Sequence, residues 1–514
     1  MTPIGRVAAT LAAALLSASP TLAASLDYGT LLGGREDFVD SVAGIAIGDD
    51  GSVYVVGGTD AGDFPVLDAL QPQIGGSVDA FVIKLTPEGE IVFSTYLGGA
   101  GADNATAVQV ASNGEVFVAG LTSSSDFPIV KGKQKRRAGA SDAWVARIAR
   151  DGSKILASTY LGGGQRESFV GLALGRSGPL ARGVYVYGAT ESLDFPEVNP
   201  TQAGYGGGLT DGFLAILKSN NLKPVLSTYA GGDANEIAVG LALNDRRGDL
   251  YLGLFDSGRP DDASITHLRL AGAAAFQPVA KPKVDYEASD RALEEVLNSS
   301  NRLLKTVVLS QYAAPPPVPV SKSAPRGALA STPGAALVLV PCVPQAPATT
   351  CNDPASLVLL DEDLQVTANR GFGGPIGTAF APEVLVSGAD GAIGIIGETT
   401  AANLTLINPI QRKRQGGFDT YLYHFPQPLT AGPSLVTYYG GRQDDFAMAV
   451  AIGPDGEIWT GGVTFSKQKL TTTNDAIQRK LAGRQDGYLV KIDPTLEAAK
   501  RSVELADEGD RRHD

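Results

Sequence analysis

The chain has 514 residues and a net charge of −13, from 55 acidic and 42 basic side chains, which argues against a nucleic-acid binder held by phosphate contacts. Glycine accounts for 63 residues, about 12% against the usual ~7%, and only 19% are charged, which disfavours both a disordered chain and a helical fold. Three histidines and two cysteines cannot supply a zinc cluster of the usual kind. These figures favour a β protein rich in turns.

The first 24 residues are typical of a secretory signal peptide. A single positive charge, Arg6, precedes the apolar run 7–16, and small residues surround a cleavage position after Ala23 or Ala24. The apolar run is too short to span a bilayer, and no later segment approaches 18 apolar residues, so we expect no membrane span. We therefore expect an exported protein, periplasmic or extracellular.

One motif recurs along the chain and sets its organisation. It is Ser-Thr-Tyr-Leu-Gly-Gly, which is intact at 94–99 and 158–163 and altered elsewhere. Together with the weaker copies, seven markers lie at 28–34, 94–99, 158–163, 227–232, 309–314, 371–374 and 437–441. Their spacing of about 65 residues indicates a repeat architecture.

Each repeat predicts four strands, because β-branched and aromatic residues alternate with polar ones in four short runs. In the second unit these are 105–110, 115–121, 142–148 and 155–161, which we call strands a, b, c and d. Tight turns link a to b and c to d. A long loop links b to c, usually with Asp-Phe-Pro, a glutamine and a glycine-rich stretch.

The ends of the chain complement each other. The last unit has strands a, b and c at 446–452, 457–463 and 486–492 but no strand d, while an unmatched strand stands at 27–32. Four-stranded units repeated radially are typical of a β-propeller, which protects its sheet edges in this way. We therefore predict an all-β, seven-bladed β-propeller of four-stranded antiparallel blades, with the ring closed by strand 27–32 pairing with 486–492.

This prediction assigns residues 25–495 to a single propeller domain and 496–514 to a charged C-terminal tail. The expected blades span about 35–97, 98–161, 162–230, 231–313, 314–372, 373–439 and 440–493 plus 27–32. Blade four is irregular, because residues 286–305 have helical spacing and predict a helical insertion before a strand d at 306–312.

Blade five is short. We expect its strands b, c and d at 335–340, 355–360 and 364–368, without a secure strand a. In an oxidising compartment Cys342 and Cys351 would form a disulfide across its shortened b–c loop; the alternative is two free thiols.

The Ser-Thr-Tyr-Leu-Gly-Gly string, the loop segment Asp-Phe-Pro and the strand start Asp-Ala-Phe resemble the bacterial SBBP repeat, the β-propeller repeat of exported proteins. Agreement is close over 27–232, recognisable over 371–493 and poor over 233–370. The resemblance implies an exported propeller and names no ligand.

The long b–c loops and the d–a links share one face of the predicted disc, to which we assign binding. The d–a links predict an acidic ring near the central channel, formed by Glu36, Asp37, Asp103, Glu167, Asp233, Glu236, Asp444 and Asp445. Carboxylates of this kind suit a calcium ion, although no EF-hand loop is present and we predict no cofactor. The alternative is that they accept backbone N–H groups in tight turns.

Basic runs occupy three of the b–c loops and form what we call the basic arc. Its members are Lys131, Lys133, Lys135, Arg136, Arg137, Arg412, Lys413, Arg414, Arg479, Lys480 and Arg484. We predict that the basic arc meets an anionic partner such as a cell-surface polysaccharide. The alternative is that these side chains are solvated surface.

We interpret the repeated aspartates, Asp-Phe-Pro segments and tyrosines as packing and turn residues. Repetition makes them equivalent in every unit, whereas catalytic residues belong to one site. The chain contains neither a Gly-Xaa-Ser-Xaa-Gly motif nor a phosphate-binding glycine motif, and no catalytic residue is predicted. We predict a non-enzymatic binding or scaffolding propeller at the cell surface or in the periplasm, with a protein or an anionic polysaccharide as partner. The alternative is a carbohydrate-active enzyme, a lyase or glycosidase, that uses carboxylates near the channel.

Overall fold

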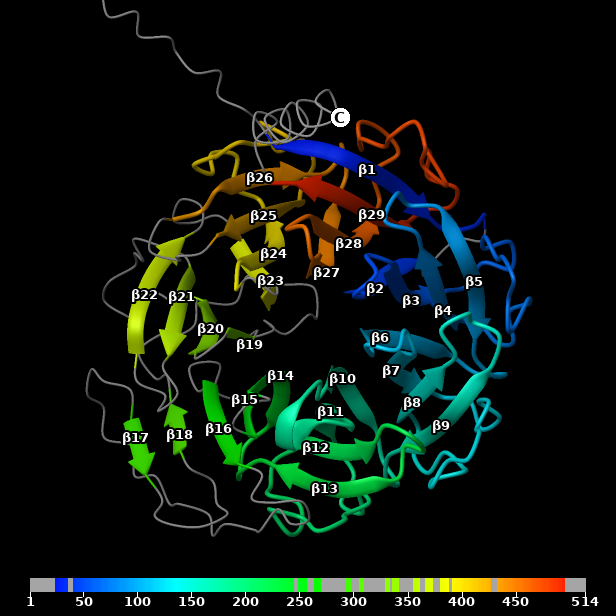
Figure 1. Ribbon diagram of the computed structural model, residues 1–514, viewed down its shortest axis with the longest axis vertical. Helices are drawn as coiled ribbons and strands as arrows, with labels where there is room; N and C mark the ends of the chain where they lie inside the picture. The colour runs from blue at the N-terminus through cyan, green and yellow to red at the C-terminus, as the bar shows by residue number, and fades with distance from the viewer. Residues whose placement is uncertain are drawn as a thin grey trace, which may run out of the picture.

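The computed structural model describes residues 24–35, 40–244, 248–256, 391–426 and 432–494, together with strands between 263 and 387 (Figure 1). Within these residues the secondary structure is almost entirely β, with 29 strands and one short 3-10 helix, Gly178–Leu180. The predicted all-β class is therefore confirmed. The signal peptide, the C-terminal tail, Glu36, Asp37, Cys342 and Cys351 lie outside the described residues.

The described strands form antiparallel sheets, which we number in chain order, with the sheet that contains both ends of the described chain last. Sheet one contains β2 (Ser41–Ile47), β3 (Val53–Thr59), β4 (Asp79–Leu85) and β5 (Ile91–Leu97). Sheet two contains β6 (Asp103–Val110), β7 (Val116–Thr122), β8 (Asp142–Ile148) and β9 (Ile155–Leu161). Sheet three contains β10 (Glu167–Leu174), β11 (Gly183–Thr190), β12 (Asp211–Lys218) and β13 (Pro224–Ala230).

Sheets four and five are formed by the middle of the chain. Sheet four has the order β14 (Glu236–Asn244), β15 (Asp249–Asp256), β16 (Ala263–Arg269), β18 (Lys305–Val308) and β17 (Leu293–Val296). Sheet five contains β19 (Leu329–Thr332), β20 (Ala335–Pro341), β21 (Ala355–Leu360) and β22 (Val366–Phe372).

The last two sheets return to the regular pattern. Sheet six contains β23 (Phe380–Ser387), β24 (Ile393–Thr399), β25 (Asp419–Phe425) and β26 (Leu435–Tyr439). Sheet seven contains β27 (Asp445–Ile452), β28 (Ile458–Thr464), β29 (Asp486–Asp493) and β1 (Ser25–Leu32).

The two ends of the described chain meet in sheet seven. Strand β1 pairs antiparallel with β29, with Tyr28 opposite Lys491 and Leu32 opposite Gly487. This confirms the predicted pairing of 27–32 with 486–492. In Figure 1 the sheets stand around a common centre, with β2, β6, β10, β14, β19, β23 and β27 nearest to it and β1 at the outer edge of sheet seven.

Apolar side chains between neighbouring sheets form the core. Tyr54 and Phe93 of sheet one pack in one cluster with Val118 and Trp144 of sheet two. Strands such as β3 and β4 are buried along their whole length, because each lies in a sheet with a neighbour on both faces. Apolar burial on both faces supplies the main driving force for joining the sheets.

The predicted helical insertion is wrong where the structure describes it. Residues 293–296 form strand β17, with Leu293 opposite Val308 and Val296 opposite Lys305 of β18; the rest of 286–305 lies outside the described residues, apart from Lys305 itself. Apolar spacing over 286–305 favours a helix, but the edge of β18 offers backbone partners that stabilise a strand at 293–296. Sheet four consequently has five strands, and β19 supplies the first strand of sheet five that the sequence did not assign securely.

Candidate functional site

The long loop between the second and third strands of a sheet is held by a half-buried glutamine and a buried aspartate. In sheet one the Gln71 Nε2 donates to Asp79 Oδ2 at 2.7 Å, and the Gln71 Oε1 accepts the Gly98 N–H at 3.1 Å. Asp79 also accepts the N–H groups of Gly75 and Gly76, at 2.8 and 3.1 Å. The same network recurs around Gln134, Gln202, Gln411 and Gln478. This is the structural role predicted for the repeated aspartates.

The repeated tyrosines secure the start of the same loop. The Tyr96 hydroxyl donates to the Ala61 carbonyl at 2.7 Å and accepts the Phe64 N–H at 3.2 Å. Burial raises the pKa of Tyr96 to about 12, so the hydroxyl stays protonated and continues to donate. Corresponding bonds are made by Tyr160, Tyr229 and Tyr438.

Three carboxylates of the predicted acidic ring are fully buried rather than open to a channel: Asp103, Glu167 and Asp445. Asp103 Oδ2 accepts the Gly99 N–H at 2.7 Å and the Ser124 hydroxyl at 2.6 Å. Burial raises the pKa of Asp445 to about 6. At these three positions the expected open ring is therefore wrong, and acceptance of backbone N–H groups is the correct explanation.

The other members of the predicted ring lie elsewhere. Asp233 is exposed, and Asp444 accepts the Phe418 N–H at 2.9 Å. Glu236 is partly buried at the start of β14. Among the described residues no group of three or more histidine, cysteine or acidic side chains is arranged to hold a metal ion.

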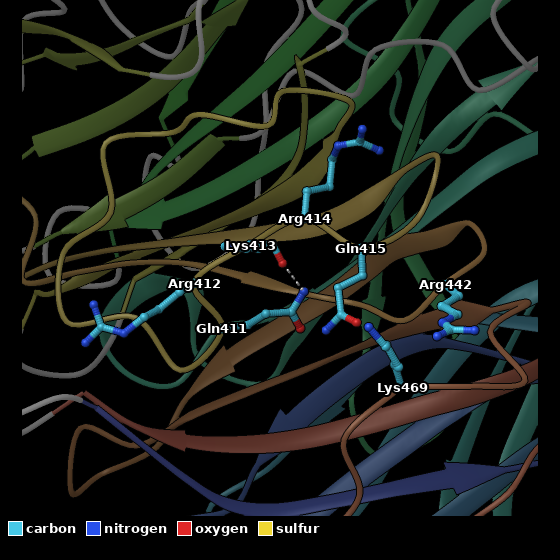
Figure 2. Close-up of a pocket in the computed structure, with 7 residues that line it drawn as sticks. All are labelled: Gln411, Arg412, Lys413, Arg414, Gln415, Arg442 and Lys469. Atoms are coloured by element: carbon cyan, nitrogen blue, oxygen red, sulfur yellow. Dashed lines mark hydrogen bonds between the residues drawn. The ribbon is translucent and has the colours of Figure 1, made fainter.

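A cationic pocket of about 660 Å³ lies where the loops of sheets six and seven meet (Figure 2). Its lining consists of Gln411, Arg412, Lys413, Arg414, Gln415, Arg442 and Lys469. The first five residues come from the β24–β25 loop, Arg442 from the β26–β27 link and Lys469 from the β28–β29 loop. The lining thus has five basic side chains and no carboxylate, which is the charge pattern of an anion-binding site.

Arg414 supports the pocket wall rather than its interior. Its Nη1 donates to the Gly416 and Gly417 carbonyls, and Figure 2 shows its guanidinium pointing away from Lys469. Arg137 makes the same kind of bond to Gly139 in sheet two. The corresponding loop position in the other regular sheets carries an apolar or aromatic side chain, at Ile74, Tyr205 and Leu481. Both arginines therefore act as braces for their own loops.

Arg442 and Lys469 are the pocket residues that the sequence prediction missed. Arg442 is held by Gln468, whose side-chain oxygen accepts from its Nη1 at 2.8 Å and whose carbonyl accepts its backbone N–H at 3.0 Å. Lys469 is exposed, and in Figure 2 its side chain extends toward Gln415. Arg442 and Lys469 are isolated basic residues and do not belong to a charge run. Only the expectation that neighbouring repeats place their loops side by side could have pointed to them.

The structure brings together only part of the basic arc. Arg412, Lys413 and Arg414 line the cationic pocket, whereas the exposed Lys131, Lys133, Lys135 and Arg136 belong to the β7–β8 loop and do not. Arg479 donates to the Thr473 carbonyl at 3.1 Å and to the Asn474 side chain, so it braces its own loop. Lys480 and Arg484 are exposed on the β28–β29 loop outside the pocket lining.

No helix in the part of the chain that the structure describes is long and apolar enough to cross a membrane. Compared with models of known protein families and with curated proteins, the chain matches none.

Proposed function

We propose that this protein is an exported, non-enzymatic seven-bladed β-propeller, similar to SBBP-repeat proteins, in which β1 completes the last blade and closes the ring. The seven sheet orders and the pairing of β1 with β29 support this architecture. A ring that is closed by both ends of the chain leaves the loops as the variable part of the molecule, and loops on a rigid scaffold commonly carry binding sites. The protein acts in the periplasm or outside the cell as a binding or scaffolding module.

The cationic pocket is the proposed binding site, and its ligand is an anionic polysaccharide. The observation that carries this proposal is a pocket of about 660 Å³ whose lining has five basic side chains, of which Arg414 braces its own loop, and no carboxylate. On a chain with a net charge of −13 this concentration of positive charge is local, so it selects an anionic partner by complementarity. The lining also lacks an aromatic side chain, so recognition rests on charge and hydrogen bonding rather than on stacking against a sugar ring.

Burial of three carboxylates of the predicted acidic ring favours binding over the alternative of a carbohydrate-active enzyme. Hydrolysis needs two carboxyl groups that a sugar can reach. Asp103, Glu167 and Asp445 are fully buried and engaged with backbone and hydroxyl donors. A substrate could reach these groups only after the sheets had separated.

The test reverses two exposed charges of the pocket, in the variant Lys413→Glu/Lys469→Glu. Binding of the full chain to polygalacturonate is measured by calorimetry at low and moderate salt, with dextran as the neutral polymer. Each exposed ionic contact contributes about 0.5–1 kcal/mol, and reversal adds repulsion, so we expect affinity to fall about tenfold or more. The wild-type affinity should also fall as salt rises.

The matched control is Lys133→Glu/Lys135→Glu, which makes the same charge change in the β7–β8 loop outside the pocket. This variant should bind within about twofold of the wild type, since long-range effects are screened. Equal losses in both double variants would show that net charge, not the pocket, governs binding. Release of shortened sugars from the polymer would instead favour the enzyme.

A further inference from the structure

Pairs of buried carboxyl groups from neighbouring sheets meet at the glycine that ends a sheet. At Gly33, a side-chain carbon would lie 2.8 Å from both Asp40 Oδ2 and Asp486 Oδ1. At Gly162, it would lie under 3.0 Å from both Glu167 and Asp142. Only glycine leaves room for the two carboxyl groups, so each pair is built into the joint between two sheets.

The bonds of the Glu167–Asp142 pair are unevenly shared. Glu167 Oε1 accepts three donors, the hydroxyls of Thr190 and Ser192 at 2.8 Å each and the Gly163 N–H at 3.3 Å. Glu167 Oε2 is buried without any hydrogen-bond partner among the described residues. A buried ionised oxygen without a donor, beside a second carboxylate, is strongly unfavourable.

Asp142 is the better of the two groups to carry the negative charge. Its oxygens accept from the Gln134 Nε2 and from the N–H groups of Ala138 and Gly139, each at 2.9 Å. Burial raises the pKa of Asp142, while these bonds and Arg137 in the same loop oppose that rise. Ionised Asp142 is therefore well solvated by the protein, whereas ionised Glu167 is not.

We propose that Glu167 and Asp142 share one proton, which resides on Glu167 Oε2 and is donated to Asp142. The bond satisfies the one oxygen that lacks a partner and reduces the charge of the pair from two negative charges to one. The Asp40–Asp486 pair repeats the arrangement, because Asp40 Oδ1 also lacks a partner among the described residues. Each pair is a proton-binding site that joins two sheets.

Burial of Glu167 favours its protonation, and the bonds from Thr190, Ser192 and Gly163 oppose it without cancelling the effect of burial. The facing groups are Asp142 on β8, Arg137 on the β7–β8 loop, the neutral Thr190 on β11 and Asp194 beyond β11, which accepts the Gly164 N–H at 2.7 Å. Burial is the largest influence and raises the pKa of Glu167 to about 7; Asp142 raises it further. For Asp40, burial likewise raises the pKa to about 7, with Asp486 and Asp60 as the facing acidic groups.

The proton makes the joint between sheets two and three sensitive to pH. Because the pKa of Glu167 is higher in the fold than the ordinary value of 4.5, its stabilising effect is fully present below that value. The effect is lost as pH rises through about 7. The joint is therefore tightest in mildly acidic conditions and weaker at pH 8.

The decisive variant is Glu167→Gln, which keeps the Oε1 acceptor and replaces the proposed O–H donor with an amide N–H. In denaturant titrations the folded-to-unfolded ratio of the wild type should fall between pH 5 and pH 8. Dividing the ratio at pH 5 by the ratio at pH 8 gives the size of this fall, and in the variant that quotient should be smaller by a factor on the order of a hundred. Infrared spectra at pH 5 should show the C=O band of a protonated carboxyl group that weakens in Glu167→Gln.

Asp142→Asn tests the acceptor of the shared proton, and Asp142 also accepts three other donors. It should destabilise the fold at both pH values and reduce the fall between pH 5 and pH 8 less than Glu167→Gln does, because burial still raises the pKa of Glu167. Equal destabilisation by Glu167→Gln at both pH values would overturn the proposal, because Glu167 would then be an ionised acceptor. Stabilisation of the wild type by calcium at pH 8 that matches acidification would also overturn it, in favour of a metal site.

Discussion

At the residue scale, one position of the long loop shows how a repeat constrains its side chains. This position lies three residues before the loop glutamine. Its backbone is left-handed in three loops, with φ of 45° at Asp68, 46° at Asn199 and 44° at Asn408. Asparagine and aspartate tolerate this region better than other non-glycine residues. The Asn408 side chain also donates to the Ser434 carbonyl at 2.8 Å, which ties the loop to the last strand.

Sheet two places Lys131 at this position with a φ of 58°. Because lysine is strained there, we expect Lys131→Asn to stabilise the protein by about 1 kcal/mol, through relief of strain and one recovered hydrogen bond. Thermal denaturation measures the effect. Lys133→Asn, in the same loop but without a left-handed backbone, should leave the melting temperature unchanged, and an equal rise in both variants would contradict the explanation.

At the element scale, the tyrosine of the last strand fixes the loop that leads to the third strand. Tyr96→Phe would remove the hydroxyl that bonds the Phe64 N–H and the Ala61 carbonyl, leaving only the long 3.4 Å hydrogen bond between those two groups. The expected cost is about 1–3 kcal/mol in the free energy of unfolding, because unmade buried hydrogen bonds carry a full desolvation penalty. Denaturant titration of the purified variant measures it.

The control for this prediction is Tyr54→Phe. The Tyr54 hydroxyl is also buried but has no hydrogen-bond partner among the described residues. Its removal should cost little or even stabilise the protein, since no partner group is orphaned. If Tyr54→Phe proved as damaging as Tyr96→Phe, the loop network would not be the source of stability.

The regular strands could be predicted because the repeat shows each of them several times, and the pairing of β1 with β29 followed from a missing strand at one end and a spare one at the other. The bulge in the first strand of six sheets, for example between Val42 and Gly44, could not be foreseen, since it depends on packing near the centre. The helix expected over 286–305 is wrong at the described residues 293–296, because apolar spacing does not show that a free sheet edge is available for pairing.

The candidate site was predicted in part, and for a physical reason. The charge run 412–414 identifies Arg412 and Lys413 directly. It does not show that Arg414 uses its guanidinium to bond the carbonyls of its own loop. Arg442 and Lys469 join the pocket only through the meeting of three loops from two sheets. Contacts within a repeat recur along the sequence and can be recognised there. Contacts between the loops of two repeats do not recur and cannot be recognised in this way.

At the scale of the whole molecule, an acidic chain carries a concentrated positive pocket on a repetitive frame. The half-buried glutamines and the buried aspartates and tyrosines are repeated and hold the frame, whereas the cationic pocket lies between sheets six and seven. A singular feature on a repeated scaffold is the expected location of function, because the frame makes every other position equivalent.

Hydrogen–deuterium exchange of the full chain, with and without polygalacturonate, tests this central claim most directly. We predict that the polymer slows exchange in the segment 411–415 and around Arg442 and Lys469, while the basic segment 131–137 exchanges as before. Protection of 131–137 and of the cationic pocket to the same extent would show binding by diffuse charge. Protection confined to any other surface would contradict the assignment of function to this pocket.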